Sequence, residues 1–127
     1  MILDTNAISD LFQANESLLE LLGNDDHQLP VIALGEYRYG LARSRLRKEL
    51  DARLRQLEAI WTVLPIDRET TRVYADVRNQ LRIGGTPIPE NDVWIAALGL
   101  QYELPIASRD DHFDQVSGVK RLRWTTE

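Results

Sequence analysis

MILDTNAIS, residues 1–9, is a short apolar run followed by three polar residues. Met1–Leu3 is too short for a helix and predicts a buried strand. Asp4, Thr5 and Asn6 are residue types that cap the N-termini of helices, so a helix should begin at once. The chain is therefore expected to start with a strand that passes directly into a helix.

The rest of the chain continues this alternation. Apolar runs predict further strands at Leu29–Leu34, Thr62–Ile66, Leu104–Ala107 and Val119–Trp124. Helical spacing predicts helices at Ala7–Phe12, Leu18–Leu22, from near Gly35 to Leu41 or Leu46, Leu50–Trp61, from the Asp67 cap to Gly84, and Val93–Tyr102 opened by Glu90. Strands that alternate with helices predict an α/β fold: a three-layer sandwich with a central parallel sheet of about four to five strands and helices on both faces.

The composition limits the class of protein. The 127 residues, 43% hydrophobic and 28% charged, fit one domain spanning residues 1–127. The absence of cysteine excludes disulfides, zinc–thiolate sites and thiol nucleophiles, and fits a cytoplasmic protein. Val93–Leu100, the longest uncharged apolar run, is far shorter than the ~20 residues of a membrane helix, so we expect no membrane association.

The net charge of −5 argues against a simple polyanion binder. The charge is unevenly distributed, because the segment Glu36–Arg55 carries seven bases and three acids. The rest of the chain therefore holds a net charge of −9, and the placement of those surplus acids is informative.

Four acids fall where predicted strands end or the following helices begin: Asp4, Glu36, Asp92 and Asp110. Ligands of open parallel sheets bind beyond the carboxyl ends of the strands. If the first and fourth strands are neighbours, Asp4 and Asp110 emerge side by side, and Asp92 can point into the same pocket. Taken singly, these residues are as readily explained as helix caps, a turn residue and a solvated charge.

Clustered carboxylates need compensation. A pair ~4 Å apart repels by roughly 4 kcal/mol at an effective dielectric constant of 20. No Lys or Arg adjoins Asp4 or Asp92 in the sequence, so protons or cations must neutralise them. Hard oxygen ligands favour Mg²⁺ or Mn²⁺ over zinc.

Four segments resemble, in order, the signature blocks of PIN-domain ribonucleases, above all the VapC-type toxins of type II toxin–antitoxin systems. The segments are MILDTNAIS (1–9), VIALGEYRYGL (31–41), PIPENDVWIAAL (87–98) and IASRDDHFDQV (106–116). The resemblance covers nearly the whole chain, and an ordered set of blocks is far more specific than any one of them.

The resemblance implies which residues form the site. The family's acids correspond to Asp4, Glu36, Asp92 and Asp110 as catalytic and metal-binding residues. Asp111 adjoins the fourth, although the alignment of the following His-Phe pair favours Asp110. Thr5, Asn6 and Ser108 are implied as polar residues that support the site.

The implied activity is that of a Mg²⁺- or Mn²⁺-dependent endoribonuclease that uses water to hydrolyse RNA, leaving 5′-phosphate and 3′-hydroxyl ends. Attack by the ribose 2′-hydroxyl usually needs a pair of histidines. His27 lies in a polar loop, and His112 is better explained as a packing or hydrogen-bonding residue.

The resemblance also implies partners. Single-stranded or loop RNA suits a recessed site, and Arg38, Arg43, Arg45, Arg47 and Lys48 are candidates to follow its backbone, with a solvated helix face as the alternative. A small cognate antitoxin is expected to fill a groove near the site, and a homodimer is expected. Leu41, Leu46, Leu50, Leu54 and Leu57 are candidates to line that groove, or else to pack in the core.

Three alternatives remain. A receiver-like phosphoacceptor domain needs a Lys after its last buried strand, where this chain has Arg109. A phosphatase with a D-x-D pair needs a second carboxylate, where this chain has Asn6. A non-catalytic PIN-like RNA-binding module predicts that the acids can be neutralised without loss of function.

Overall fold

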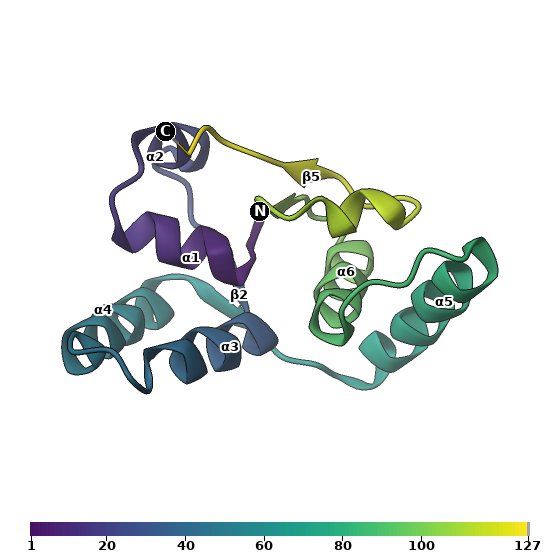
Figure 1. Ribbon diagram of the computed structural model, residues 1–127, viewed down its shortest axis with the longest axis horizontal. Coiled ribbons are helices and arrows are strands. Elements are labelled where there is room, and N and C mark those ends of the chain that lie inside the picture. Colours follow the sequence, from purple (N-terminus) through teal and green to yellow (C-terminus); the bar gives the residue numbers. More distant parts are fainter. Residues whose placement is uncertain (127) are drawn as a thin grey trace.

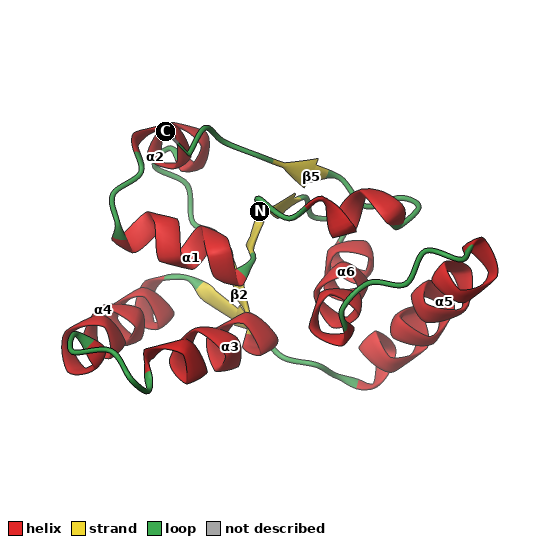
Figure 2. Cartoon of the chain, in the orientation of Figure 1, coloured by secondary structure: helices red, strands yellow, loops and turns green. Residues whose placement is uncertain are grey.

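The structure, a computed structural model, describes residues 1–126 (Figures 1 and 2). Its elements are, in chain order, β1 (Ile2–Leu3), α1 (Thr5–Phe12), α2 (Glu16–Leu22), β2 (Gln28–Pro30), α3 (Val31–Leu41), α4 (Arg47–Ile60), β3 (Thr62–Leu64), α5 (Arg68–Gly84), α6 (Glu90–Tyr102), β4 (Ile106–Ala107), the 3₁₀ helix η1 (Asp111–Gln115) and β5 (Arg121–Leu122).

The five strands form one parallel sheet in the order β3-β2-β1-β4-β5. From the central strand β1, the chain first adds β2 and β3 on one side and then β4 and β5 on the other. The strand order therefore reverses between β1 and β4, which is the topological switch point of the sheet. Figure 1 shows α1–α4 grouped on one side of this point and α5 with α6 on the other, and α3 contacts α6. The predicted α/β architecture with a parallel sheet and flanking helices is confirmed.

The core surrounds β1 and α6. Ile2 and Leu3 are fully buried, and α6 buries residues around most of its circumference, as its apolar sequence predicts. Gly99 of α6 lies against β4, where an added methyl group would come within 2.9 Å of Ile106. This close approach sets the distance between the central helix and the sheet.

The prediction of a strand over Leu29–Leu34 is wrong after Pro30, because residues 31–34 are helical. Pro30 ends β2, and α3 begins at Val31 instead of near Gly35. A proline has no N–H to continue the strand pairing, and its fixed φ suits the start of a helix. Glu36 consequently lies in the second turn of α3 and not at its beginning.

The other predicted strands exist but are shorter than the apolar runs. Residues 65–66, 104–105, 119–120 and 123–124 lie outside the strands that were predicted to include them. The predicted turn after β4 contains an N-cap, because the Asp110 carboxylate accepts a hydrogen bond from the His112 amide at 3.0 Å and η1 follows.

The predicted caps are present. Asp4 precedes α1, and Asp67 forms a capping box with Thr70 at the start of α5. At the other end of α5, Gly85 takes a left-handed conformation with φ +67°, which ends the helix where the sequence predicts. Among residues 1–126, no helix is both long and apolar enough to cross a membrane.

Replacing Gly99 with Ala should destabilise the fold by about 1–3 kcal/mol, because the new methyl group overpacks the contact between α6 and Ile106. The matched control is Gly35→Ala in α3, where the methyl group has open space. This control should stabilise the protein by up to about 1 kcal/mol through helix propensity. Urea unfolding measures both, and a stabilised Gly99→Ala variant would contradict the close packing.

Candidate active site

The first acid of the site is placed by strand pairing. Leu3 of β1 pairs with Ala107 of β4, so the next residues, Asp4 and Ser108, leave the sheet side by side. The Ser108 hydroxyl donates a hydrogen bond to Asp4 Oδ2 at 2.7 Å, and the Thr5 amide donates to Oδ1 at 2.8 Å. Asp4 is 4% exposed, so this carboxylate is both buried and oriented.

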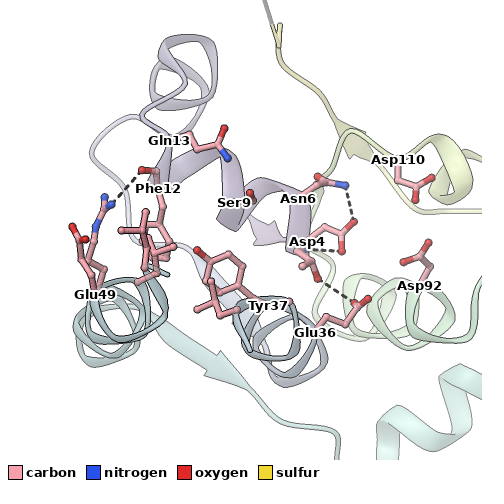
Figure 3. Close-up of a pocket in the computed structure, with 16 residues that line it drawn as sticks. Asp4, Asn6, Ser9, Phe12, Gln13, Glu36, Tyr37, Glu49, Asp92 and Asp110 are labelled. Atoms are coloured by element: carbon pink, nitrogen blue, oxygen red, sulfur yellow. Dashed lines mark hydrogen bonds between the residues drawn. The ribbon is translucent and has the colours of Figure 1, made fainter. Parts of the chain in front are cut away.

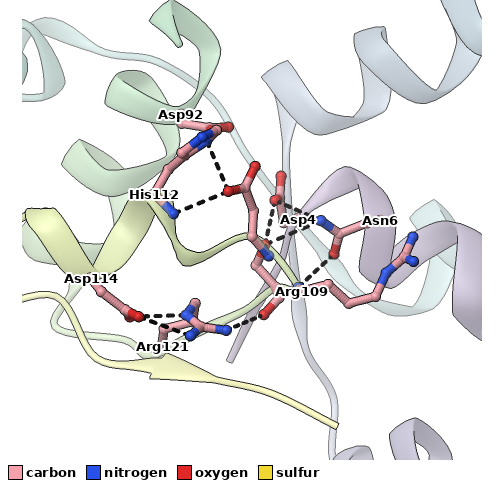
Figure 4. A network of polar contacts seen from close by, with 9 residues as sticks. Asp4, Asn6, Asp92, Arg109, His112, Asp114 and Arg121 are labelled. Carbon is pink, nitrogen blue, oxygen red and sulfur yellow. Dashed lines mark hydrogen bonds and ion pairs between the residues drawn. The ribbon is translucent and has the colours of Figure 1, made fainter. Parts of the chain in front are cut away.

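Ser108 connects both strand ends. Its hydroxyl accepts from Asn6 Nδ2 at 3.2 Å and from the Asp110 amide at 2.9 Å. The Asn6 carbonyl oxygen in turn accepts from the Arg109 amide at 3.0 Å (Figure 4). Asn6 and Ser108, predicted to support the site, therefore lock the loop after β4 onto the start of α1.

The second acid, Glu36, reaches the same place from α3. The Thr5 hydroxyl donates to Glu36 Oε1 at 3.1 Å, while the Thr5 amide holds Asp4. Figure 3 shows Asp4 and Glu36 facing a common space with Asp92 and Asp110 on its other side. Thr5 thus links two of the acids that the sequence singled out.

The carboxylates of Asp92 and Asp110 both contact the side chain of His112. Asp92 lies in the first turn of α6, and its Oδ2 is 3.0 Å from His112 Nδ1. The same ring nitrogen is 2.8 Å from Asp110 Oδ1. All four predicted acids line one groove, whereas Asp111, the alternative fourth acid, is exposed and begins η1 outside it.

The electrostatics of the site reflect burial and crowding. Burial raises the pKa of Asp4 from 3.8 to about 6, and the charges of Asp92 and Glu36 act in the same direction. Burial also raises the pKa of Asp92, with a contribution from Asp110. The hydrogen bond to Asp92 raises the pKa of His112. Ionising Asp4 and Asp92 in the folded chain therefore costs free energy, and a bound cation would offset that cost.

The donor set fits a hard divalent cation. Asp92, Asp110 and His112 each offer an atom that lies within 4.8 Å of the other two. Asp4 and Glu36 line the same groove and add carboxylate oxygens. Mg²⁺ and Mn²⁺ prefer carboxylate oxygens of this kind. Burial raises the pKa values of Asp4 and Asp92, so a bound cation would favour their ionised forms.

The whole groove, including the part lined by the acids, has a volume of about 610 Å³. Its far part is apolar, lined by Phe12, Tyr37, Leu41, Leu46 and Leu50. For Leu54 the core alternative holds, because this side chain is fully buried and does not line the groove. Leu57 lines a separate hollow beside α2 and α4, so three of the five predicted leucines face the groove.

The predicted basic residues divide into two groups. Arg38, whose side chain is 37% exposed, forms ion pairs with Asp51 at 2.9 Å and Glu58 at 2.7 Å. By contrast, Arg43, Arg45, Arg47 and Lys48 are exposed on the α3–α4 loop and the first turn of α4. This second group presents its positive charge to solvent.

Two features of the site escaped the sequence reasoning. Arg53 lines the groove with its guanidinium 4.7 Å from the centre of the Phe12 ring. Asp10, buried in α1, accepts from Trp124 Nε1 at 2.9 Å and pairs with Arg109, which fixes the chain beside Asp110. These three contacts each join residues more than 40 positions apart, and no local pattern signals them.

Comparison with known proteins points in one direction. The PIN domain model matches residues 1–119. The chain is 33% identical to "Ribonuclease VapC5" of Mycobacterium tuberculosis, covering 93% of this chain and 88% of that protein, and 31% identical to "Toxin FitB" of Neisseria gonorrhoeae, covering 87% of each. The chain also superposes on the crystal structure of VapBC-5 from Mycobacterium tuberculosis, described as a member of the VapBC family of toxin–antitoxin systems. The TM-score is 0.76, with 29% sequence identity and 96% of both chains covered.

Asp4→Asn should stabilise the protein by about 1–3 kcal/mol at pH 7 in the presence of a chelator. The free energy cost of ionising Asp4 in the folded state is absent below its unfolded pKa of 3.8 and complete above about 6. The advantage of the variant should therefore grow as pH rises from 4 to 7, as measured by urea unfolding at several pH values.

The matched control is Asp76→Asn, which neutralises an exposed acid of α5. It should change stability by no more than about 0.5 kcal/mol at any of these pH values. If Asp4→Asn instead lowered stability at pH 7, the hydrogen bonds that Asp4 accepts would outweigh its burial, and the carboxylate would be a structural cap.

Proposed function

Since the chain belongs to the PIN-domain family, in its VapC group, we propose that it is a divalent-metal-dependent endoribonuclease that acts as the toxin of a toxin–antitoxin pair. The observation that carries this proposal is the convergence of Asp4, Glu36, Asp92 and Asp110 on one groove. The names of the relatives, ribonuclease and toxin, support the reaction class.

Each acid has a proposed role. Asp4, Asp92 and Asp110 hold Mg²⁺ or Mn²⁺, and Glu36 binds a second ion or orients the attacking water. When bound, the metal activates water and stabilises negative charge on the phosphate and on the leaving oxygen. Thr5, Asn6 and Ser108 keep Asp4 and Glu36 oriented through the hydrogen bonds described above.

The chemistry is hydrolysis of a phosphodiester. The water oxygen forms a new bond to phosphorus, and the bond from phosphorus to the 3′ oxygen breaks. The water gives up a proton and the leaving oxygen gains one, so the products carry 5′-phosphate and 3′-hydroxyl ends. The chain contributes by holding the water and the phosphate on the acidic side of the groove, out of bulk solvent.

The groove is recessed, which favours a splayed RNA strand over a rigid duplex. Arg43, Arg45, Arg47 and Lys48 supply exposed positive charge at the end of α3 and the start of α4. They are proposed to contact the phosphates that flank the cleaved bond, so that the acidic site need not attract RNA by itself.

A cognate antitoxin is proposed to occupy the apolar part of the groove. Phe12, Tyr37, Leu41, Leu46 and Leu50 offer a hydrophobic surface that a short amphipathic segment can cover. The structural relative described as a member of a toxin–antitoxin system supports this partner class. A segment bound there would also close the route to the acids and thereby block cleavage.

The proposal is tested by incubating the pure protein with mixed transfer, ribosomal and messenger RNA, with Mn²⁺ or with chelator, and mapping the fragment ends. Cleavage should require metal and leave 5′-phosphates. Asp110→Asn should reduce the rate by at least about 100-fold, because it removes a proposed ion ligand. Asp111→Asn, the neighbouring exposed acid, should retain activity within about threefold.

Fragments with 2′,3′-cyclic phosphate ends, or full cleavage in chelator, would refute metal-dependent hydrolysis. Loss of activity in Asp111→Asn with retention in Asp110→Asn would exchange the roles of these two acids. Intact RNA with the wild-type protein under all metal conditions would favour a non-catalytic binding module.

Replacing Arg43 and Arg47 together with Ala should weaken RNA binding by about tenfold at low salt, with a smaller effect at high salt, because contacts with phosphate release counterions. Binding can be measured by fluorescence anisotropy with the inactive Asp4→Asn protein as background. The matched control, Arg68→Ala with Arg72→Ala on α5, should bind as tightly as that background. Equal affinity for both pairs would assign Arg43 and Arg47 to a solvated face.

A further inference from the structure

The arrangement around His112 suggests a role that the four acids alone do not explain. His112 lies in η1, and its ring nitrogen Nδ1 is 3.0 Å from Asp92 Oδ2 and 2.8 Å from Asp110 Oδ1. Its backbone N–H also donates to Asp110 Oδ1 at 3.0 Å. One residue therefore contacts both carboxylates, which come from different elements of the fold. Figure 4 shows the contact between His112 and Asp92.

We propose that His112 is a positioning residue that holds the Asp92 and Asp110 carboxylates together in the arrangement in which they bind a divalent ion. This inference rests on the proposed metal-dependent function and adds a residue to it. Asp92 and Asp110 repel each other, and the charge of Asp110 acts on the Asp92 carboxyl. A donor between them offsets that repulsion before any ion arrives.

The backbone around His112 is itself well fixed. Asp110 caps η1, the Asp110 amide is tied to Ser108, and the next residue, Phe113, is fully buried. The imidazole therefore projects from an anchored position, so its contacts with the carboxylates are not those of a free surface side chain. Positioning groups of this kind typically change metal affinity by about 10–100-fold when they are removed.

The His112 side chain is 42% exposed. The ring is thus not a core element, and truncating it should leave the fold intact, since Phe113 carries the packing of η1. This separation of packing from positioning makes the role of His112 testable without unfolding the protein.

The test measures Mn²⁺ binding directly, by the electron paramagnetic resonance signal of free Mn²⁺ during titration of the full chain. His112→Ala should weaken the dissociation constant by about 10–100-fold. His112→Asn should restore it to within about threefold of wild type, because the Asn amide nitrogen occupies the place of Nδ1 and can donate to the same carboxylates. Asp111→Asn is the matched control, with affinity within about threefold of wild type.

In chelator, His112→Ala should still unfold in one cooperative transition, with a midpoint at most a few degrees below that of wild type, because the ring offsets repulsion between the carboxylates but does not pack in the core. Unchanged Mn²⁺ affinity in His112→Ala, or tighter binding, would overturn the positioning role. Equal losses in His112→Ala and His112→Asn would also overturn it, since the ring nitrogen would then be needed as an ion ligand. Absence of Mn²⁺ binding by the wild-type protein would instead refute the metal-dependent function on which the inference rests.

Discussion

The structure depends on the pairing of β1 with β4, two strands that lie about 100 residues apart in the sequence. Their register places Asp4 beside Ser108, and the 2.7 Å hydrogen bond between these side chains ties the first turn of α1 to the loop that carries Asp110. A shift of one residue would turn Asp4 to the other face of the sheet. This contact positions Asp4 and the loop of Asp110, whereas α3 and α6 bring Glu36 and Asp92 to the same groove.

At the acidic end of the groove, the stability of the fold and the proposed activity make opposite demands on the carboxylates. Burial of Asp4 and Asp92 raises their pKa values, so at neutral pH the folded chain ionises these groups at a free energy cost. Thr5, Asn6, Ser108 and His112 limit that cost by donating hydrogen bonds. Under the proposed function, a cation bound by these carboxylates would offset that cost.

The accuracy of the sequence predictions depended on whether the signal was local. The caps at Asp4 and Asp67, the end of α5 at Gly85 and the burial of α6 follow from residue types and spacing over a few positions, and all are present. The boundary between β2 and α3 was predicted wrongly, because Val31 and Ile32 favour strands locally while Pro30 and packing favour a helix. For Leu54 the sequence left groove and core open, since apolar spacing does not distinguish the two, and the structure places it in the core.

By itself the sequence determined the alternation of strands and helices, the four candidate acids and the resemblance of its blocks to the PIN family. These are properties of composition and short-range order. The tertiary structure alone decided that Asp4, Glu36, Asp92 and Asp110 share a groove, that Arg38 is held by ion pairs, and that His112 joins two acids. Such contacts depend on strand order and helix placement, which arise from packing of the whole chain and are not encoded in any one segment.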